Sequence, residues 1–293
     1  MKAEAPVRPL SPPPNPSLRT RRPPPWLKGA LIAVVSIYIL LLLGIPAINV
    51  FYQAFKGGLG DFFGNLQQRD FLSALWLTAL TALIAVPINT IFGLCAALAI
   101  AHKQFRGRTF LLSVIDLPFS ISPVVAGLMF VLLFGRNGWF GPLLQAANIR
   151  IIFAFPGIIL ATAFITMPFV VREVLPVLEE AGTDQEEAAR TLGANDWQTF
   201  WRVTLPNIRW GLLYGVILTN ARAMGEFGAV AVVSGNIVGK TQTLPLFVED
   251  AYKSYATPSA YAAAVLLSLL AVLTVIIKEV LERRFNIQAK GRH

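Results

Sequence analysis

Six long apolar stretches constrain the fold of this chain more than any other feature of its sequence. They are residues 26–51, 71–101, 110–134, 151–175, 208–234 and 258–281. A helix that crosses the hydrocarbon core of a bilayer needs about 20 mostly apolar residues, and each stretch is long enough. None of them alternates with the two-residue period of a membrane β-barrel strand. We therefore predict an all-α integral membrane protein with six transmembrane helices.

The composition agrees with a membrane protein and excludes several other classes. Hydrophobic residues make up 55% of the 293 residues and charged residues only 14%, which is too apolar for an ordinary soluble domain. The single cysteine, Cys95, excludes a disulfide framework, and two distant histidines, His102 and His293, provide no zinc-type ligand cluster. We expect neither a metal site nor catalytic residues in this chain.

The distribution of Lys and Arg predicts the orientation of the helices. With the N-terminus inside, eighteen of these residues fall on the inner side and six on the outer side. The inner ones lie in the N-terminal tail, in the loops 102–108 and 172–209, and at the C-terminal end. Because cytoplasmic loops are enriched in positive residues, we predict that both termini are cytoplasmic (N-in/C-in). This bias accounts for the net charge of +9, so we expect membrane lipid and not nucleic acid as a partner.

A charged segment between the fourth and fifth apolar stretches carries a regularly spaced motif. Its fixed positions are Glu187, Ala188, Ala189, Gly193, Val203, Leu205 and Pro206. The residues around Glu187 favour helix, and Gly193 can end that helix because glycine takes a positive φ without strain. A second short helix is predicted from Asp196 to Val203, closed by Pro206. Local physics thus predicts a helix-turn-helix at a membrane face, which a plain amphipathic connector would also satisfy.

Charged residues inside the apolar stretches are candidates for a translocation path. Arg222 and Glu226 lie four residues apart about halfway along the fifth stretch, so both face one side of a helix. Charges at such a depth are costly unless they are paired or hydrated. The pair therefore either locks helix packing or serves the path. Asp116 in the third stretch is another path candidate, or else a partner for Arg222 or a residue near a loop.

A polar interruption divides the third stretch near its middle. Ser120, Ser122 and Pro123 lie there, and the proline removes one backbone hydrogen bond. Broken helices at this depth often line substrate sites, because their free amide groups attract anions. Ser120 and Ser122 are therefore path candidates as well, although a simple proline kink is the commoner explanation of such a pattern.

Two glycine patterns have structural interpretations. The segment from Gly235 to Thr241 looks like a phosphate-binding loop, but it has one residue too few between its glycines and follows a membrane helix instead of a strand. We interpret it as an external turn, so any ATP must bind to another subunit. Small residues also recur along the fifth stretch, at Gly211, Gly215, Ala221 and Gly225. They suit close helix packing, either within the chain or across a dimer interface.

The motif around Glu187 resembles the EAA loop of ABC importer permeases. That pattern is EAA, three residues, Gly, nine residues, Ile, one residue and Leu-Pro, and only the Ile differs here, where Val203 replaces it. The resemblance implies that residues 179–206 form a coupling loop. Such a loop docks on a separate ATPase subunit and carries its motion to the membrane helices.

Further runs resemble one family of sulfate permease subunits, CysW, over nearly all of the chain from the first apolar stretch onward. The runs are residues 115–119, 122–128, 168–173, 205–210 and 220–230. The run around Arg222 is also similar to the sister subunit CysT and to molybdate permeases. It therefore indicates oxyanion import more firmly than it indicates sulfate.

The resemblance implies the domain organisation. A type I ABC importer (MetI-like) transmembrane domain would occupy residues 71–282, preceded by the first transmembrane helix and an external loop at 26–70. Residues 1–25 hold nine of the twenty prolines and four arginines, so they are expected to be a disordered cytoplasmic tail. Residues 283–293 would form a cytoplasmic C-terminal tail.

The resemblance also implies the complex and its task. CysT would form a heterodimer with this chain, two copies of the ATPase CysA would bind ATP and Mg, and a periplasmic sulfate-binding protein would deliver the anion. The implied function is import of sulfate, and with it thiosulfate, across the bacterial inner membrane by a multi-pass subunit that needs no cofactor of its own.

Other functions stay open from the sequence. A permease for molybdate, tungstate or another oxyanion would carry the same motifs. An ion-coupled secondary transporter could use Asp116, Arg222 and Glu226 as a relay, but it would leave the Glu187 motif unexplained, and the usual repeat with paired broken helices is not apparent. A membrane anchor or receptor would not need polar groups at mid-depth.

Overall fold

A computed structural model describes residues 25–101 and 105–290, without the side chains of Pro25 and of residues 281–290. Within these ranges every regular element is a helix. The chain divides into two compact units, residues 1–49 and 50–293. The predicted proline-rich tail up to residue 24, the residues 102–104 and the last three residues lie outside the described part.

The first unit holds the start of a long apolar helix that contains one wider turn. α1 covers Pro25–Ile39, the π-helical turn η2 covers Leu40–Gly44, and α2 covers Ile45–Phe55. In the wider turn the amide of Ile45 donates to the carbonyl of Leu40, five residues back. Pro46 follows immediately, and a proline ring clashes with the carbonyl four residues before it in a regular α-helix. The wider turn accommodates that ring and lets the helix continue.

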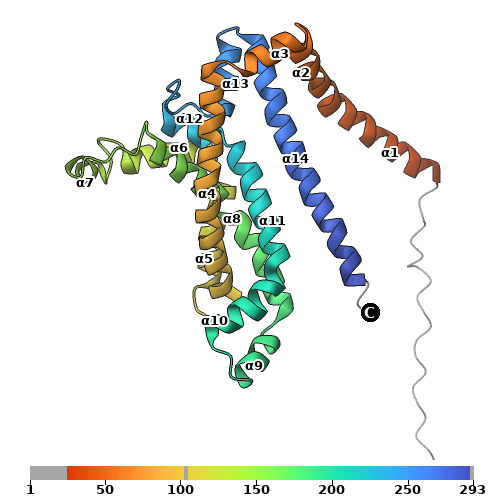
Figure 1. Ribbon diagram of the computed structural model, residues 1–293, viewed down its shortest axis with the longest axis vertical. Helices are drawn as coiled ribbons and strands as arrows, with labels where there is room; N and C mark the ends of the chain where they lie inside the picture. The colour runs from red at the N-terminus through yellow and green to blue at the C-terminus, as the bar shows by residue number, and fades with distance from the viewer. Residues whose placement is uncertain (1–24, 102–104, 291–293) are drawn as a thin grey trace, which may run out of the picture. The chain divides into compact units, whose positions relative to one another are not determined.

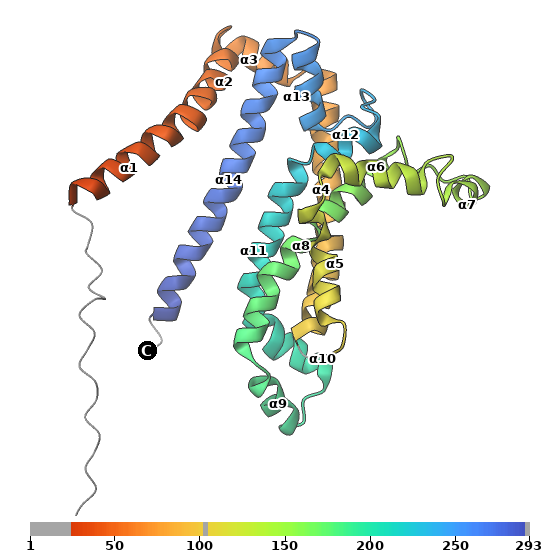
Figure 2. The same ribbon diagram turned by 180° about the vertical axis from the view of Figure 1, so that it is seen from behind.

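Three long helices form the centre of the second unit: α4 (Arg69–Ala101), α8 (Phe155–Ala181) and α11 (Leu205–Met224). They pack on one another, as Figures 1 and 2 show. A Cβ added at Gly93 would lie 2.6 Å from Cβ of Val170, and one at Gly215 would lie 2.9 Å from Cα of the same residue. A Cβ at Gly211 would lie 2.7 Å from the carbonyl oxygen of Glu173. The glycines of α11 thus serve packing within the chain.

Two of the predicted spans are each divided into two helices. α5 (Arg108–Ser120) and α6 (Pro123–Phe134) meet at 109°, and α11 and α12 (Gly228–Ser234) meet at 53°. The interruption of the third stretch was predicted, but a simple kink is wrong. Pro123 instead begins α6, where its missing N–H leaves no hydrogen bond unmade. The division of the fifth stretch was not predicted, although Gly225 and Gly228 flank it and glycine is a poor helix former.

The two divided spans pack against each other just beyond their breaks. α6 lies on α12. A Cβ added at Gly127 would lie 2.8 Å from the carbonyl oxygen of Ala229, and one at Gly228 would lie 2.8 Å from Cβ of Pro123. Since neither contact leaves room for a side chain, α6 and α12 form one closely packed layer.

Several short helices lie at the two ends of the second unit (Figures 1 and 2). α3 (Leu59–Leu66), α13 (Leu244–Lys253) and the start of α14 (Thr257–Lys290) lie at one end, and α9 (Asp184–Thr191) and α10 (Asp196–Thr199) lie at the other. α7 (Gly141–Ala146) follows α6. Phe71, Leu244 and Phe247 belong to a buried core at the first end. The segment with the Glu187 motif therefore lies at the end away from α3 and α13.

In the described part of the chain, four helices are long and apolar enough to cross a membrane: Trp26–Phe55, Arg69–Ala101, Phe155–Ala181 and Thr257–Val280. The number rises to six when each bent pair is counted as one span. The six apolar stretches of the sequence correspond to this higher count. The orientation of the spans stays a prediction.

Candidate coupling loop and translocation path

The segment between α8 and α11 folds as two short helices joined by a glycine turn, as predicted. α9 ends at Thr191 and α10 begins at Asp196. Gly193 between them has a φ of +90°, a conformation that other residues rarely adopt. A Cβ added at Gly193 would meet nothing within 4 Å. The backbone conformation, and not the available space, therefore requires glycine.

Polar side chains hold the second helix and the turn in place. Asn195 Oδ1 accepts a hydrogen bond from the amide of Gln198 at 2.8 Å, and the amide of Asn195 donates to Gln198 Oε1 at 3.1 Å. This reciprocal pair is a capping box, which satisfies two amide groups at the start of α10. Arg190 Nη2 lies 3.1 Å from Asp196 Oδ1, so an ion pair also joins the two sides of the turn.

Pro206 does not close the second helix, so that prediction is wrong. The chain continues from α10 through a π-helical turn, η3 (Phe200–Thr204), directly into α11. The amide of Leu205 donates to the carbonyl of Phe200, five residues back. A wider turn thus precedes Pro206 as it precedes Pro46, and it accommodates the proline ring in the same way. Val203 lies in this turn, and Leu205 and Pro206 begin α11, so the segment is continuous with a central helix.

A buried carboxylate ties α9 to this wider turn. Glu186 is 7% exposed, and Thr204 Oγ1 donates to Glu186 Oε1 at 2.6 Å. Glu187, which belongs to the sequence motif, is exposed and accepts from Thr183 Oγ1 at 2.9 Å. The motif missed Glu186 and Thr204. The only sequence signal for this hydrogen bond was the adjacent pair Glu186 and Glu187. Two neighbouring acidic residues on a helix allow one carboxylate to face the protein while the other faces solvent.

The outer surface of this segment carries large apolar side chains. Leu192 is 89% exposed, Trp197 69% and Trp201 50%. The rings of the two tryptophans lie 5.5 Å apart. On α9, Ala188 is exposed and Ala189 is half-buried. Clustered aromatic and apolar side chains on an otherwise charged segment are typical of a docking surface for another protein.

Arg222 and Glu226 are in contact, but they do not share one continuous helix. Arg222 Nη1 lies 2.6 Å from Glu226 Oε2. Because α11 ends at Met224, Glu226 lies in the break before α12, where its Oε1 accepts from the amide of Ala229 at 3.0 Å. The side chain of Glu226 is 1% exposed and that of Arg222 35% exposed. The carboxylate therefore holds the start of α12, while the guanidinium stays partly accessible.

Asp116 pairs with Arg172 of α8. Its Oδ1 lies 3.0 Å from Arg172 Nε, so Asp116 is not the partner of Arg222. Arg172, which the charge count grouped with the loop 172–209, lies within α8. Ser120 and Ser122 are exposed on the two sides of the break between α5 and α6.

The segment from Gly235 to Thr241 forms a tight turn whose amide groups are engaged by the protein. The amides of Lys240 and Thr241 donate to the carbonyl of Ile237 at 3.1 and 2.9 Å. The amide of Ile237 donates to Thr241 Oγ1 at 3.1 Å, and that of Asn236 to Ser234 Oγ at 3.1 Å. A phosphate-binding loop needs free amide groups that point at the ligand. These four amides are therefore not arranged to hold a phosphate.

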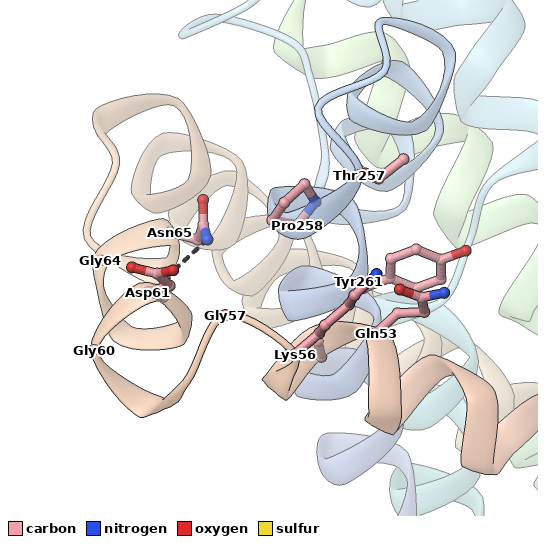
Figure 3. Close-up of a pocket in the computed structure, with 11 residues that line it drawn as sticks. Gln53, Lys56, Gly57, Gly60, Asp61, Gly64, Asn65, Thr257, Pro258 and Tyr261 are labelled. Atoms are coloured by element: carbon pink, nitrogen blue, oxygen red, sulfur yellow. Dashed lines mark hydrogen bonds between the residues drawn. The ribbon is translucent and has the colours of Figure 1, made fainter.

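A polar cavity of about 750 Å³ opens at the other end of the second unit (Figure 3). Its lining residues include Lys56, Asp61, Asn65 and Tyr261. Figure 3 shows Asn65 Nδ2 bonded to the backbone oxygen of Asp61, at 2.8 Å. The cavity lies between the end of α2 and the residues that follow it, α3 and the start of α14, and it opens to the surface at this end.

Comparison with known proteins identifies the family of this chain. The family model of the binding-protein-dependent transport system inner membrane component matches residues 89–287. The sulfate transport system permease protein CysW of Synechocystis is 64% identical over 258 residues, which cover 88% of this chain and 94% of that protein. The protein of the same name from Escherichia coli K12 is 49% identical over 269 residues, 92% of each chain.

A solved structure shares the fold. It is a bacterial alginate ABC transporter in complex with an alginate pentasaccharide-bound periplasmic protein. One chain of it matches with a TM-score of 0.74 and 20% identity, over 89% of this chain and 95% of that chain. At this identity the likeness concerns the fold alone.

Proposed function

The chain belongs to the family of inner membrane components of binding-protein-dependent transport systems, and from this premise we propose that it carries sulfate. Members of this family are the permease subunits of ABC importers. The observation that carries the choice of sulfate is the identity of 64% and 49%, over nearly the full length, with two proteins described as sulfate transport permeases. Thiosulfate, which resembles sulfate in shape and charge, is the expected second substrate.

The proposed mechanism couples a separate ATPase to the membrane helices through residues 179–206. Leu192, Trp197 and Trp201 would provide the apolar contact with that ATPase, because all three are exposed on this otherwise charged segment. ATP and its Mg would be bound by the ATPase. The Glu186–Thr204 hydrogen bond and the turn at Gly193 support this role, since they make the segment a defined body instead of a flexible linker.

Motion of the docked segment would reach the path through α11. The segment continues into α11 without an irregular linker, and α11 ends at the break next to Glu226. Beyond the break, α12 is packed on α6 at Gly127 and Gly228. A displacement of α10 would therefore shift the breaks of both divided spans together. Concerted movement at these breaks would open the anion path to one side of the membrane at a time.

The proposed complex contains a sister permease, two ATPase subunits and a periplasmic binding protein. We place the Glu187 motif and both termini in the cytoplasm of a bacterial cell, with this chain in the inner membrane. The recess of Figure 3 then faces the periplasm, where the binding protein would dock. The solved alginate transporter with its bound periplasmic protein supports such an arrangement by fold.

Uptake of labelled sulfate tests the substrate. Cells that lack this gene should lose sulfate uptake, and the intact gene on a plasmid should restore it. Excess unlabelled thiosulfate should compete with sulfate, and molybdate should not. Normal sulfate uptake without the gene, in cells with no other sulfate importer, would refute the proposal.

One specific observation favours molybdate or tungstate as an alternative substrate. The run around Arg222 is shared in similar form with molybdate permeases, so molybdate or tungstate remains the second candidate. Loss of molybdate uptake with unchanged sulfate uptake in the deletion strain would select it. An ion-coupled secondary transporter is not supported, because the matching family model describes a component of binding-protein-dependent transport systems.

A further inference from the structure

The side chain of Arg172 is held in a defined position from two sides. Asp116 Oδ1 lies 3.0 Å from its Nε. The ring of Phe119 lies under the guanidinium, with Cζ 4.7 Å from the ring centroid. The rings of Phe169 and Phe119 in turn pack at 82° to each other, with 5.2 Å between their centroids. A planar guanidinium that is bonded at Nε and stacked on one face has little remaining freedom.

The other end of this guanidinium is available. Within the described residues, the hydrogen bond that the structure assigns to Arg172 uses Nε and leaves both Nη groups without one. The side chain is 56% exposed and that of Asp116 38%. Two Nη groups in one plane present parallel donors, and this fork suits two oxygens of one oxyanion. Arg172 is thus an oriented cation with its fork turned to an open side.

The position of this pair in the fold makes its exposure significant. At 1.5 Å per residue, Arg172 lies about 26 Å along α8 from Phe155. If the hydrocarbon core, about 30 Å thick, begins at Phe155, Arg172 lies within its inner part. The outward face of such a pair cannot be covered by lipid without a large cost. It must therefore face water or another protein chain.

Polar groups continue along the same two helices on both sides of the pair. Towards the coupling loop, Arg108 of α5 and Glu179 of α8 form a second ion pair. Towards the middle of the molecule, Ser120 lies one helical turn beyond Asp116 and is exposed. Residues four apart share a face of a helix, so Ser120 and Asp116 lie along one polar strip of α5. This strip leads from the break between α5 and α6 towards the end that carries the coupling loop.

We propose that this strip is the wall of the inner half of the anion path, and that Arg172 contacts the anion through its Nη groups on the way to the cytoplasm. Asp116 and Phe119 are positioning residues that aim the fork. The proposal rests on the proposed import of an oxyanion and names a residue for it. Asp116 also cancels much of the positive charge of Arg172. The contact is therefore weak, as a path needs if the anion is to leave quickly.

The test uses a reporter cysteine next to the pair in the complete importer. The single cysteine is first removed by Cys95→Ser. Ser120→Cys then reports on the strip, and Leu83→Cys is the matched control, because Leu83 is 69% exposed on α4 in an apolar surface. Inside-out membrane vesicles receive a charged, water-soluble thiol reagent, with and without sulfate. The cysteine at 120 should react, and sulfate should slow the reaction severalfold. The cysteine at 83 should stay unreactive.

A second variant tests Arg172 itself. Added to the reporter, Arg172→Gln should leave the cysteine at 120 reactive and abolish protection by sulfate. Arg172→Lys should keep only part of the protection, because it retains the charge but not the fork. Removing a charge-assisted hydrogen bond should also lower sulfate uptake by about 10- to 100-fold in Arg172→Gln. Binding-protein-stimulated ATP hydrolysis should persist in this variant, since the coupling loop is untouched.

The possible outcomes separate this inference from the proposed substrate. An unreactive cysteine at position 120, or sulfate protection that persists in Arg172→Gln, would overturn the inference. Protection by molybdate and not by sulfate would refute the proposed substrate and support the path. Loss of ATP hydrolysis together with uptake in Arg172→Gln would assign the residue to coupling and would also overturn the inference.

Discussion

Replacing Arg222 should destabilise the protein through the carboxylate that it leaves behind. Glu226 is 1% exposed, and Arg222 is the cation in contact with it at 2.6 Å. Arg222→Met therefore leaves a buried charge without a counter-charge, which costs about 3–5 kcal/mol in comparable pairs. Glu226→Ala leaves the guanidinium of Arg222 without its counter-charge, but this side chain is 35% exposed and can be solvated by water. We expect the arginine variant to be the less stable of the two.

The hydrogen bond to Ala229 predicts which second change restores stability. In Arg222→Met with Glu226→Gln, the buried charge is gone and an oxygen still accepts from the amide of Ala229. In Arg222→Met with Glu226→Leu, that amide is left unpaired, which costs about 1–3 kcal/mol. The first double variant should therefore recover most of the lost stability, and the second should recover clearly less.

The assay is the apparent melting temperature of the purified importer in detergent, with an exposed ion pair as control. Glu249 and Lys253 have the same four-residue spacing, at 2.5 Å, but are 33% and 70% exposed. Glu249→Gln should cost less than about 1 kcal/mol. The reasoning is refuted if Arg222→Met is as stable as this control, or if Glu226→Gln does not rescue it.

Transport by the rescued variants then decides the role of the pair. Arg222→Met with Glu226→Gln should fold and still fail to carry sulfate, because the accessible guanidinium next to the break is missing. Full recovery of sulfate uptake would show that the pair serves only the packing of α11 and α12.

Two further predictions concern coupling and the source of ATP. Gly193→Val should leave the protein in the membrane but uncouple ATP hydrolysis from sulfate uptake, since a β-branched residue avoids a φ of +90°. The control is Gly29→Val, because a Cβ added at Gly29 meets nothing within 4 Å and the φ of this residue is not positive. Normal sulfate uptake by the Gly193 variant would contradict the coupling assignment. Lys240→Ala should leave ATP hydrolysis by the assembled complex unchanged. The purified chain should bind no ATP in equilibrium dialysis. Loss of ATP hydrolysis in a complex that still assembles would show that the turn at Lys240 takes part in that hydrolysis.

Local features were predicted well where one or a few residues determine the backbone conformation. The helix-turn-helix around Gly193 and the interruption before Pro123 both follow from one residue with a restricted or permissive φ. Pro206 was misjudged for a related reason. A proline ends a regular helix, but a single wider turn accommodates it, and a local rule does not choose between the two outcomes.

Partners of buried charges were predicted less well. Arg222 and Glu226 are close in sequence, so their contact could be foreseen. Asp116 could not be assigned, because its choice between Arg222 and Arg172 depends on which helix packs beside α5. The same holds for Glu186, whose partner Thr204 is eighteen residues away and comes close through the turn at Gly193.

The sequence by itself determined that this chain is a helical membrane protein with a motif that resembles the coupling loop of ABC importer permeases, since apolar length and residue spacing are properties of the chain alone. The tertiary structure decided that the fifth stretch divides before α12, that Glu226 holds the start of that helix, and that Arg172 is aimed by Asp116 and Phe119. These features depend on side chains that approach from different helices. Their distances are set by how α5, α8 and α11 pack, and no periodicity within one stretch contains that information.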